Sequence, residues 1–254
     1  THESSWSSWK PSMASKVLET QYLRGCVEIE LNRYRGQMKI TPLFLILLSF
    51  ILISCATRVL KTDVRQNLKI GEVARFSGNA SATLNNKARP LGKGDAVYEG
   101  DLIQTGTATR LLIQMTDGAE IVLGDGTTLL VERYRFDTAN QEDQAVLQVK
   151  QGVFHSKSGR LASRHPDRFR IKTAFAAIGV KGTEFWGGFW ESGVFDVALL
   201  QGKGVIVTNP GGTVEITTIG WGTSLVDATT APTPPAPWSK EKLARASATV
   251  AWEK

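Results

Sequence analysis

Cysteine is scarce in this sequence, which contains only Cys26 and Cys55 among its 254 residues. Two cysteines cannot supply a disulfide framework, so the fold must be held together by an apolar core. A disulfide between the two stays an alternative, although the residues around Cys55 indicate another use for it. The composition, 42% hydrophobic and 21% charged, is typical of one globular domain with tails.

Histidine is almost as scarce, with three residues in the chain. His155 and His165 lie in polar, loop-like sequence without an HExxH pair or a partner cysteine. Ser156 and Ser158 lie near His155, but closeness along the chain does not make a catalytic triad. No nucleophile-elbow serine or glycine-rich phosphate loop is found. We therefore predict that the protein is not an enzyme and has no catalytic residues.

Long runs of like charge are also missing. The 30 Lys and Arg residues are interspersed with 24 Asp and Glu residues. Residues 1–54 hold six of the former and four of the latter, so the rest of the chain has a formal charge of +4. Proteins that bind nucleic acid concentrate positive charge along one run or face. The sequence therefore predicts no nucleic-acid partner.

Only one long apolar run is present. From Leu43 to Ile53 every residue except Ser49 is apolar, a length that suits a signal-peptide core better than a membrane-spanning helix. Met38 and Lys39 precede the run, and it ends in Leu-Ile-Ser-Cys at residues 52–55. This ending resembles the bacterial lipobox, which implies a diacylglycerol on the cysteine and cleavage directly before it.

The order of these signals divides the amino-terminal part of the chain. We predict that the native protein starts at Met38 and that residues 1–37 are a translation of the sequence upstream of that start. Residues 38–54 are predicted to be a lipoprotein signal peptide, and residues 55–69 a tether that begins at lipidated Cys55. Met13 is an alternative start. A single-pass signal anchor is the alternative to lipidation. Apart from the lipid, we predict no cofactor and no metal.

Residues 70–226 carry short β-rich runs, separated by Gly, Asp and Asn about every ten residues. This pattern predicts an all-β domain of sandwich, barrel or solenoid type. Residues 109–134 read as a meander of three strands with turns at Asp117-Gly118 and Asp125-Gly126. In the third strand, alternation sets Leu129, Val131 and Arg133 on one face and Leu130, Glu132 and Tyr134 on the other. These aspartates lack the spacing of calcium ligands. Residues 85–94 and 155–168 read as loops because they combine Gly or Pro with charge and lack apolar spacing.

A Pro-rich tail follows, over residues 227–254. Its first part is predicted to be extended and to pack no core of its own. A short helix is expected after Ser239, the predicted N-cap, with Glu241 in its first turn. Its apolar face is small, so the helix is expected to dock weakly or fray.

Four segments, in order, resemble the FecR family. The resemblance runs from about Gly71 to Ser224 and implies a two-sheet sandwich or solenoid-like roll of short, mostly antiparallel strands, followed by the short carboxyl-terminal helix. The segments are GDAVYEGDLIQTGTATRLLIQMTDGAEIVL, LQVKQGVF, FRIKTAFAAIGVKGTEFWGGF and VALLQGKGVIV.

One departure from the family matters for function. FecR proteins that regulate iron-uptake sigma factors begin with a cytoplasmic helical domain followed by a membrane span. Here nothing before residue 38 resembles such a domain, and a lipobox takes the place of the span. The signalling role therefore does not transfer directly from the resemblance.

Two groups of residues are candidates for recognition. Lys181, Gly182, Thr183 and Glu184 form the most family-like segment; structure is the favoured role, and a partner surface is the alternative. Exposed tryptophans can stack on sugar rings, although tryptophans near strands more often fill a core. The candidates for a glycan site are Trp186, Trp190 and Trp221.

Together these features predict a lipid-anchored FecR-domain protein that acts as a non-catalytic binding, sensing or scaffolding module. We expect it on the periplasmic side of the cell envelope, at the outer membrane, because Ala56 is not the aspartate that retains lipoproteins in the inner membrane of enteric bacteria. Its expected partners are the membrane and a periplasmic protein or glycan. The alternatives are a membrane-spanning regulator of sigma-factor signalling, with its span over residues 40–56, and a periplasmic glycan-binding module.

Overall fold

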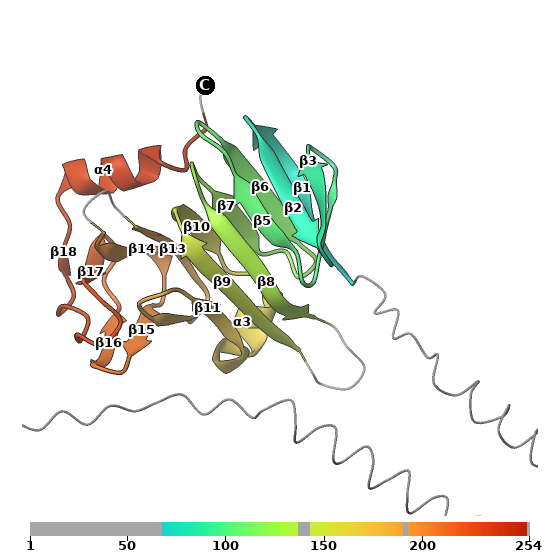
Figure 1. Ribbon diagram of the computed structural model, residues 1–254. Helices are drawn as coiled ribbons and strands as arrows, with labels where there is room; N and C mark the ends of the chain where they lie inside the picture. The colour runs from blue at the N-terminus through green and yellow to red at the C-terminus, as the bar shows by residue number, and fades with distance from the viewer. Residues whose placement is uncertain (1–67, 137–142, 190–192, 253–254) are drawn as a thin grey trace, which may run out of the picture. The chain divides into compact units, whose positions relative to one another are not determined.

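A computed structural model describes residues 68–136, 143–189 and 193–252. The chain divides into two compact units, residues 1–64 and 65–254, and all of the described residues belong to the second. The strands form two sheets of nine strands each within these residues (Figure 1). A short helix follows near the carboxyl terminus. The predicted all-β, two-sheet fold with a carboxyl-terminal helix is therefore confirmed.

The two sheets are built from strands taken alternately along the chain. In spatial order the first sheet contains β18 (Ala236–Pro237), β17 (Trp221–Leu225), β14 (Phe195–Gly202), β13 (Thr183–Phe189), β10 (Val153–Lys157), β7 (Glu120–Leu123), β6 (Arg110–Met115), β1 (Lys69–Ser77) and β4 (Ala96–Tyr98). The second sheet contains β16 (Gly212–Ile216), β15 (Val205–Asn209), β12 (Ala177–Val180), β11 (Phe169–Lys172), β9 (Gln144–Gln151), β8 (Thr128–Arg135), β5 (Leu102–Thr105), β2 (Ala80–Leu84) and β3 (Lys87–Leu91).

Most of the chain makes one or two strands in a sheet and then crosses to the other. After residue 101 the strands β5 to β18 advance along both sheets in one direction, as in a flattened solenoid. Neighbouring strands are antiparallel except β9 and β11, which run parallel. Between those two, β10 lies in the other sheet, and a segment with the helix α3 (Arg160–Arg164) and the single turn η1 (Pro166–Arg168) brings the chain back.

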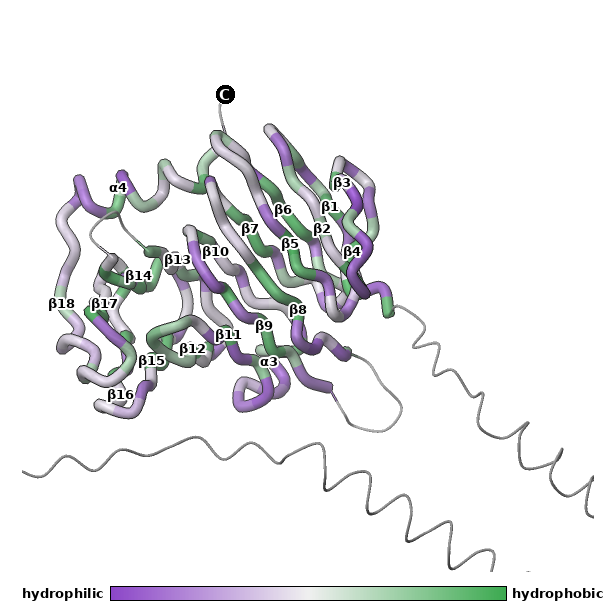
Figure 2. Tube along the Cα trace, in the orientation of Figure 1, coloured by the Kyte–Doolittle hydropathy of each residue, from purple (hydrophilic) through white to green (hydrophobic). Residues whose placement is uncertain are grey.

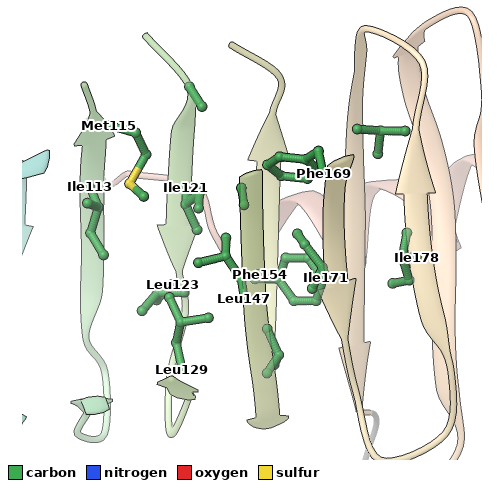
Figure 3. Packing of buried hydrophobic residues seen from close by; sticks show 14 of the residues in the cluster. Ile113, Met115, Ile121, Leu123, Leu129, Leu147, Phe154, Phe169, Ile171 and Ile178 are labelled. Carbon is green, nitrogen blue, oxygen red and sulfur yellow. The ribbon is translucent and has the colours of Figure 1, made fainter. Parts of the chain in front are cut away.

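The core lies between the sheets. Alternate residues of each strand face inward, and apolar side chains from both sheets meet there (Figure 3). Phe154 and Phe185 contact edge to face at 5.7 Å in the middle of the core. Figure 2 shows the apolar segments gathered in the strands and the polar ones at the turns. Burial of each large aliphatic or aromatic side chain stabilises the fold by about 1.5–3 kcal/mol.

The predicted three-strand meander is wrong in its second half. β6 and β7 form a hairpin at Asp117-Gly118, but β8 lies in the other sheet, between β5 and β9. The chain crosses between the sheets at residues 124–127. A Cβ at Gly124 would lie 2.4 Å from the Val153 side chain, so this corner packs too tightly for any residue larger than glycine at position 124.

The expected alternation of β8 also changes along the strand. Leu129 and Val131 share the core-facing side of the strand, but a bulge between Val131 and Arg133 shifts the register, so Arg133 does not continue that row. Tyr134 therefore faces inward, at 1% exposure, and Arg133 is exposed. A period-two pattern cannot anticipate this shift, because the bulge inserts one residue.

Both segments predicted to be loops contain regular structure. In residues 85–94, Asn85 and Asn86 have φ angles of 50° and 62° and make the tight turn between β2 and β3. Asparagine tolerates this left-handed conformation, so an Asn-Asn hairpin signal was present in the sequence. Residues 155–168 contain the end of β10 and both α3 and η1.

Hydroxyl groups join the corners where the chain changes sheets. In each case a hydroxyl oxygen accepts a hydrogen bond from a backbone N–H and donates one to the carbonyl of the same residue; we call this arrangement a hydroxyl bridge. The bridges join Thr109 to Asn79 (2.9 and 3.1 Å), Thr105 to Thr127 (2.8 and 3.3 Å), Thr127 to Val153 (3.1 and 2.9 Å), Ser158 to Thr183 (3.0 and 2.9 Å) and Thr183 to Gly204 (3.3 and 2.8 Å).

The carboxyl-terminal tail is an integral part of the described unit. After β18 pairs with β17, the helix α4 (Lys240–Ala248) begins at the predicted N-cap Ser239, whose side chain accepts from the Lys242 N–H at 3.1 Å. The helix lies across one end of the first sheet in Figure 1. Farther along, Arg75 of β1 stacks on Trp252 at 4.3 Å.

The expectation that α4 docks weakly or frays is wrong, because polar and aromatic contacts add to its small apolar face. Lys242 Nζ lies 2.9 Å from the buried carboxylate of Asp196 and 4.0 Å from the ring centre of Trp238. The Trp186 indole N–H donates to the hydroxyl of Thr249 at 3.0 Å. Ala246 is fully buried against Trp186. The tail therefore covers part of the outer face of the first sheet.

The hydroxyl bridges generate a prediction for stability. Thr127→Val keeps the side-chain shape but leaves the N–H of Val153 without its partner, whereas the Val153 carbonyl still accepts from the Gly124 N–H at 2.9 Å. We expect the free energy of unfolding to fall by about 1–3 kcal/mol. Urea unfolding followed by tryptophan fluorescence measures this change. Thr116→Val, at an exposed position, is the control and is expected to change stability by less than about 0.5 kcal/mol. Equal effects for the two variants would contradict the structural role of the bridge.

Candidate binding surface

The segment Lys181–Glu184 forms the corner between β12 and β13. Gly182 has a φ angle of +67°, a conformation that favours glycine, and both Lys181 and Gly182 are exposed. Thr183 is buried at 3% exposure and takes part in two hydroxyl bridges. Glu184 Oε1 lies 2.9 Å from Nε2 of His155 on the neighbouring strand. Thr183 is thus structural, whereas Lys181, Gly182 and part of Glu184 remain accessible to a partner.

A shallow depression lies beside this corner. Its volume is about 490 Å³, and it is open to solvent. The hydroxyl bridge from Ser158 to Thr183 connects one wall of the depression to the Lys181–Glu184 corner. The lining residues come from the β6–β7 turn and from the segment that leads into α3: Asp117, Gly118, Ser158, Gly159, Arg160, Ser163 and Arg164.

Asp117 holds the floor of the depression together. Its carboxylate is 1% exposed and accepts hydrogen bonds from the Tyr134 hydroxyl at 2.6 Å and from the N–H groups of Ala119 and Leu161 at 3.0 Å. Burial, reinforced by the negative charge of Asp117, raises the pKa of Tyr134 well above its usual value. The sequence identified Asp117 as a turn residue; its second role needs partners 17 and 44 residues away, which no local pattern reveals.

Two arginines give the depression its charge. Arg160 donates from Nε to the Asp117 carbonyl and from Nη2 to the Thr116 carbonyl, both at 3.2 Å. The guanidinium groups of Arg160 and Arg164 also stack over the ring of Phe136, at 4.7 and 5.4 Å. Both arginines are exposed. A partner at this surface therefore meets two oriented cations beside an aromatic ring, an arrangement suited to carboxylate or phosphate groups.

The serine and histidine residues of this region are not arranged for nucleophilic catalysis. His155 pairs with Glu184, whereas Ser156, its neighbour on β10, is buried at 1% exposure and so lies on the opposite face of the strand. The hydroxyl of Ser158 is occupied by its bridge to Thr183. Within the described residues, no cluster of His, Cys, Asp and Glu could hold a metal ion.

The tryptophans proposed for glycan stacking do not form an exposed cluster among the described residues. Trp186 is fully buried beneath the tail and contacts Trp238 edge to face at 6.0 Å. Trp221 packs against the main core from β17. Trp190 lies outside the described residues. The prediction of a stacking role for Trp186 is therefore wrong: the tail covers it, as no strand pattern could have shown.

A comparison with models of protein families matches part of the described unit. Residues 101–204 match the family model described as FecR protein. This part of the chain is similar to a FecR domain. The matched part of the FecR domain extends from Asp101, at the start of β5, to Gly204, at the corner after β14. It includes the depression and the Lys181–Glu184 corner, and it is narrower than the resemblance seen in the sequence.

Solved structures with a similar arrangement are more distant. Two crystal structures of a proposed anti-sigma factor from Parabacteroides distasonis, at 2.50 and 1.65 Å resolution, each share 17% identity with this chain. Both give a TM-score of 0.44, and the alignment covers 56% of this chain and 62% of the solved one. The comparison with curated proteins found no match.

The predicted membrane anchor lies outside the described residues. This applies to the signal peptide of residues 38–54, to lipidated Cys55 and to most of the tether. None of the helices in the described ranges is long and apolar enough to cross a bilayer. The FecR domain supports a signalling or regulatory role, whereas the mode of attachment to a membrane remains a prediction from the sequence.

The Tyr134–Asp117 contact predicts how stability depends on pH. Because the pKa of Tyr134 is raised in the folded state, its contribution is complete below about pH 10, where tyrosine of the unfolded chain stays protonated, and is lost as pH rises further. We expect the wild-type protein to lose stability above pH 10 more steeply than Tyr134→Phe, by up to about 1.4 kcal/mol per pH unit.

Urea unfolding at several pH values between 8 and 11.5 measures the two slopes. Tyr98→Phe, a change at a half-buried tyrosine of β4, is the control and is expected to keep the wild-type slope. Parallel curves for wild type and Tyr134→Phe would show that the hydroxyl is not held in its neutral form by the fold.

Proposed function

We propose that this protein is a lipid-anchored, extracytoplasmic FecR-domain protein that acts as a non-catalytic binding or sensing module. The surface formed by the arginine-lined depression and the Lys181–Glu184 corner is its partner site. The partner is a periplasmic protein that presents acidic groups to Arg160 and Arg164. The protein acts at the periplasmic face of the outer membrane.

The observation that carries this proposal is the arrangement at one end of the FecR domain. Hydroxyl bridges and the buried carboxylate of Asp117 hold the corners rigid, while exposed Arg160, Arg164 and Lys181 project from them. Rigid corners reduce the entropy lost on binding, and arginines beside an aromatic ring are frequent in the energetically important parts of interfaces. The site is therefore better suited to recognition than to catalysis.

The membrane anchor is supported by the sequence before the domain. The lipobox-like residues 52–55 provide the lipidation site, and β1 begins at Lys69. The intervening 13 residues, 56–68, span at most about 45 Å when extended. Each buried methylene of an acyl chain contributes about 0.8 kcal/mol, so two or three chains anchor a protein firmly where one binds marginally.

The FecR family match also supports a second candidate, a membrane-spanning regulator of sigma-factor signalling. In that case residues 40–56 cross the membrane and the preceding residues contact a cytoplasmic partner. The two candidates share the extracytoplasmic FecR domain. They differ in the amino terminus of the protein found in the cell.

Lipidation gives the decisive prediction for the anchor. In the native host, labelling with an alkyne fatty acid, intact mass and amino-terminal analysis are expected to show a chain that begins at acylated Cys55. Cys55→Ser is expected to abolish the label and to leave an uncleaved chain. Cys26→Ser is the control and is expected to be labelled as wild type. An unlabelled wild-type chain that retains residues before Met38 would overturn lipidation and favour the spanning regulator.

The partner surface is tested separately. In native membranes solubilised with mild detergent, we expect the protein to migrate as a complex on blue-native gels, and Arg164→Glu to lower the complexed fraction roughly tenfold because it reverses a charge at the depression. Arg170→Glu, an exposed arginine on β11, is the control. Equal loss with both variants, or a free wild-type protein, would contradict the proposed surface.

A further inference from the structure

The two sheets have four edge strands, and they are not equally protected. The edges are β18 and β4 in the first sheet and β16 and β3 in the second. An edge strand presents backbone N–H and C=O groups that another strand can pair with, and proteins normally block such edges. Three of the four edges here are blocked by identifiable residues.

The β4 edge is closed by an ion pair. Arg89 binds both carboxylate oxygens of the buried Asp101, at 2.8 and 2.6 Å, and also donates to the Ala96 carbonyl at 3.0 Å. The same carboxylate accepts from the Tyr98 N–H at 2.8 Å, and the Asp101 N–H donates to the Tyr98 carbonyl at 3.1 Å. The Ala96 carbonyl and both outward backbone groups of Tyr98 therefore already have partners.

Proline protects two further edges. In β3, Pro90 occupies a position from which its N–H would point outward, so the edge lacks that donor. In β18, the pairing with β17 covers only Ala236 and Pro237, and two more prolines directly precede them. Neither edge can extend a regular ladder.

The β16 edge has no such protection. The Lys181 N–H donates to the Gly204 carbonyl at 3.1 Å, so the backbone groups of Gly204 point toward β12. Because backbone groups alternate along a strand, the N–H and C=O groups of residues 205, 207 and 209 point toward β16. Their partners in β16 are 216, 214 and 212, which leaves the N–H and C=O groups of Thr213 and Glu215 pointing outward. Within the described residues, no hydrogen bond to these four groups is found, and β16 contains neither proline nor lysine.

Exposed apolar residues follow β16 and β17 in the chain. Ile219, in the turn from β16 to β17, is 60% exposed, and Val226, directly after β17, is 59% exposed. They are two of the three exposed large hydrophobic residues in the described part of the chain. In a solenoid-like fold the last strands must be capped, and here β18 caps the first sheet. Residues 229–231 pack against the β15–β16 turn at Gly211 and Gly212, where Asn209 donates to the Thr230 carbonyl at 2.7 Å, but no strand pairs with Thr213 and Glu215 within the described residues.

We propose that β16 is a docking edge that pairs with an extended segment of a partner protein. Outward N–H and C=O groups two residues apart match another strand, whereas a glycan or a helix cannot satisfy them in series. The carboxylate of Glu215, which lies 2.8 Å from Nζ of Lys181, selects a Lys, Arg or Thr on the same face of the added strand. Apolar residues on the other face extend the row that includes Val214, which packs partly buried against the core. This site does not include Arg160 or Arg164 of the depression, although its Glu215 is paired with Lys181 of the neighbouring corner, and it does not depend on lipidation.

Peptide selection on the full-length protein tests the proposal. A phage-displayed library of random heptapeptides is selected on the wild-type chain after depletion on Thr213→Pro, which removes one outward N–H and places a ring on the edge. Thr213→Ala is the matched control, because it loses the same hydroxyl contact with Thr208 but keeps the N–H. We expect enriched peptides to alternate apolar residues with Thr, Lys or Arg.

The selected peptides are then measured by calorimetry and amide hydrogen exchange. We expect Thr213→Pro to weaken binding about tenfold and Thr213→Ala to leave it within about twofold of wild type. Binding is expected to slow exchange at the amides of Thr213 and Glu215. If Thr213→Pro does not fold, wild-type protein is measured with two versions of each peptide, N-methylated at the odd or at the even residues. Only the version that methylates the N–H groups facing β16 is expected to lose binding.

Three outcomes would overturn the proposal. Peptides that bind wild type and Thr213→Pro equally would recognise another surface. A selection without enrichment would show that the edge accepts no strand. Protection of Thr213 and Glu215 that rises with protein concentration in the absence of peptide would show that a second copy of this chain, not a partner protein, occupies the edge.

Discussion

The hydroxyl bridges at the sheet-to-sheet corners are the interaction on which the rest of this structure depends. A chain that repeatedly leaves one sheet for the other interrupts its backbone hydrogen bonds at each crossing. Buried N–H and C=O groups without partners destabilise a fold by about 1–3 kcal/mol each. Thr109, Thr127 and Thr183 each accept from the N–H of a residue in another corner and donate to the carbonyl of that residue, which also accepts from a backbone N–H. The same corners can then pack closely around the core.

This constraint also places the candidate binding surface. The bridge from Ser158 to Thr183 joins the α3 segment to the Lys181–Glu184 corner, and the carboxylate of Asp117 joins that segment to the β6–β7 turn. The exposed arginines therefore project from a rigid frame assembled from three parts of the chain. A rigid frame loses little conformational entropy when it binds a partner. The surface and the stability of the fold thus share the same residues.

The ends of the sandwich differ in how they are closed. The ion pair between half-buried Arg89 and buried Asp101 closes the edge at β4, and the tail covers part of the outer face of the first sheet through Lys242 and Trp186. The β16 edge has neither device. Since natural proteins usually block such edges, an open edge followed in the chain by the exposed Ile219 is better explained by recognition than by chance.

Several features could be predicted from local sequence because they depend on neighbouring residues. Ser239 alone supplies the acceptor for the first turn of α4, and Asp117-Gly118 alone makes the β6–β7 turn. The all-β class follows from short apolar runs separated by turn residues. The loop predicted over residues 85–94 is wrong, because Asn85 and Asn86 adopt the left-handed conformation and make a tight turn between two strands. This turn too depends only on neighbouring residues.

Other features depend on residues far apart in the chain. The buried role of Asp117 requires Tyr134 and Leu161, and the burial of Trp186 requires a tail more than 50 residues later. The crossing after β7 depends on how tightly Gly124 packs against Val153. The sequence by itself determined the all-β class, the β6–β7 turn, the cap of α4 and the resemblance to the FecR family. Only the tertiary structure decided which side chains are covered and which edge stays open, because burial and pairing depend on residues brought together by folding.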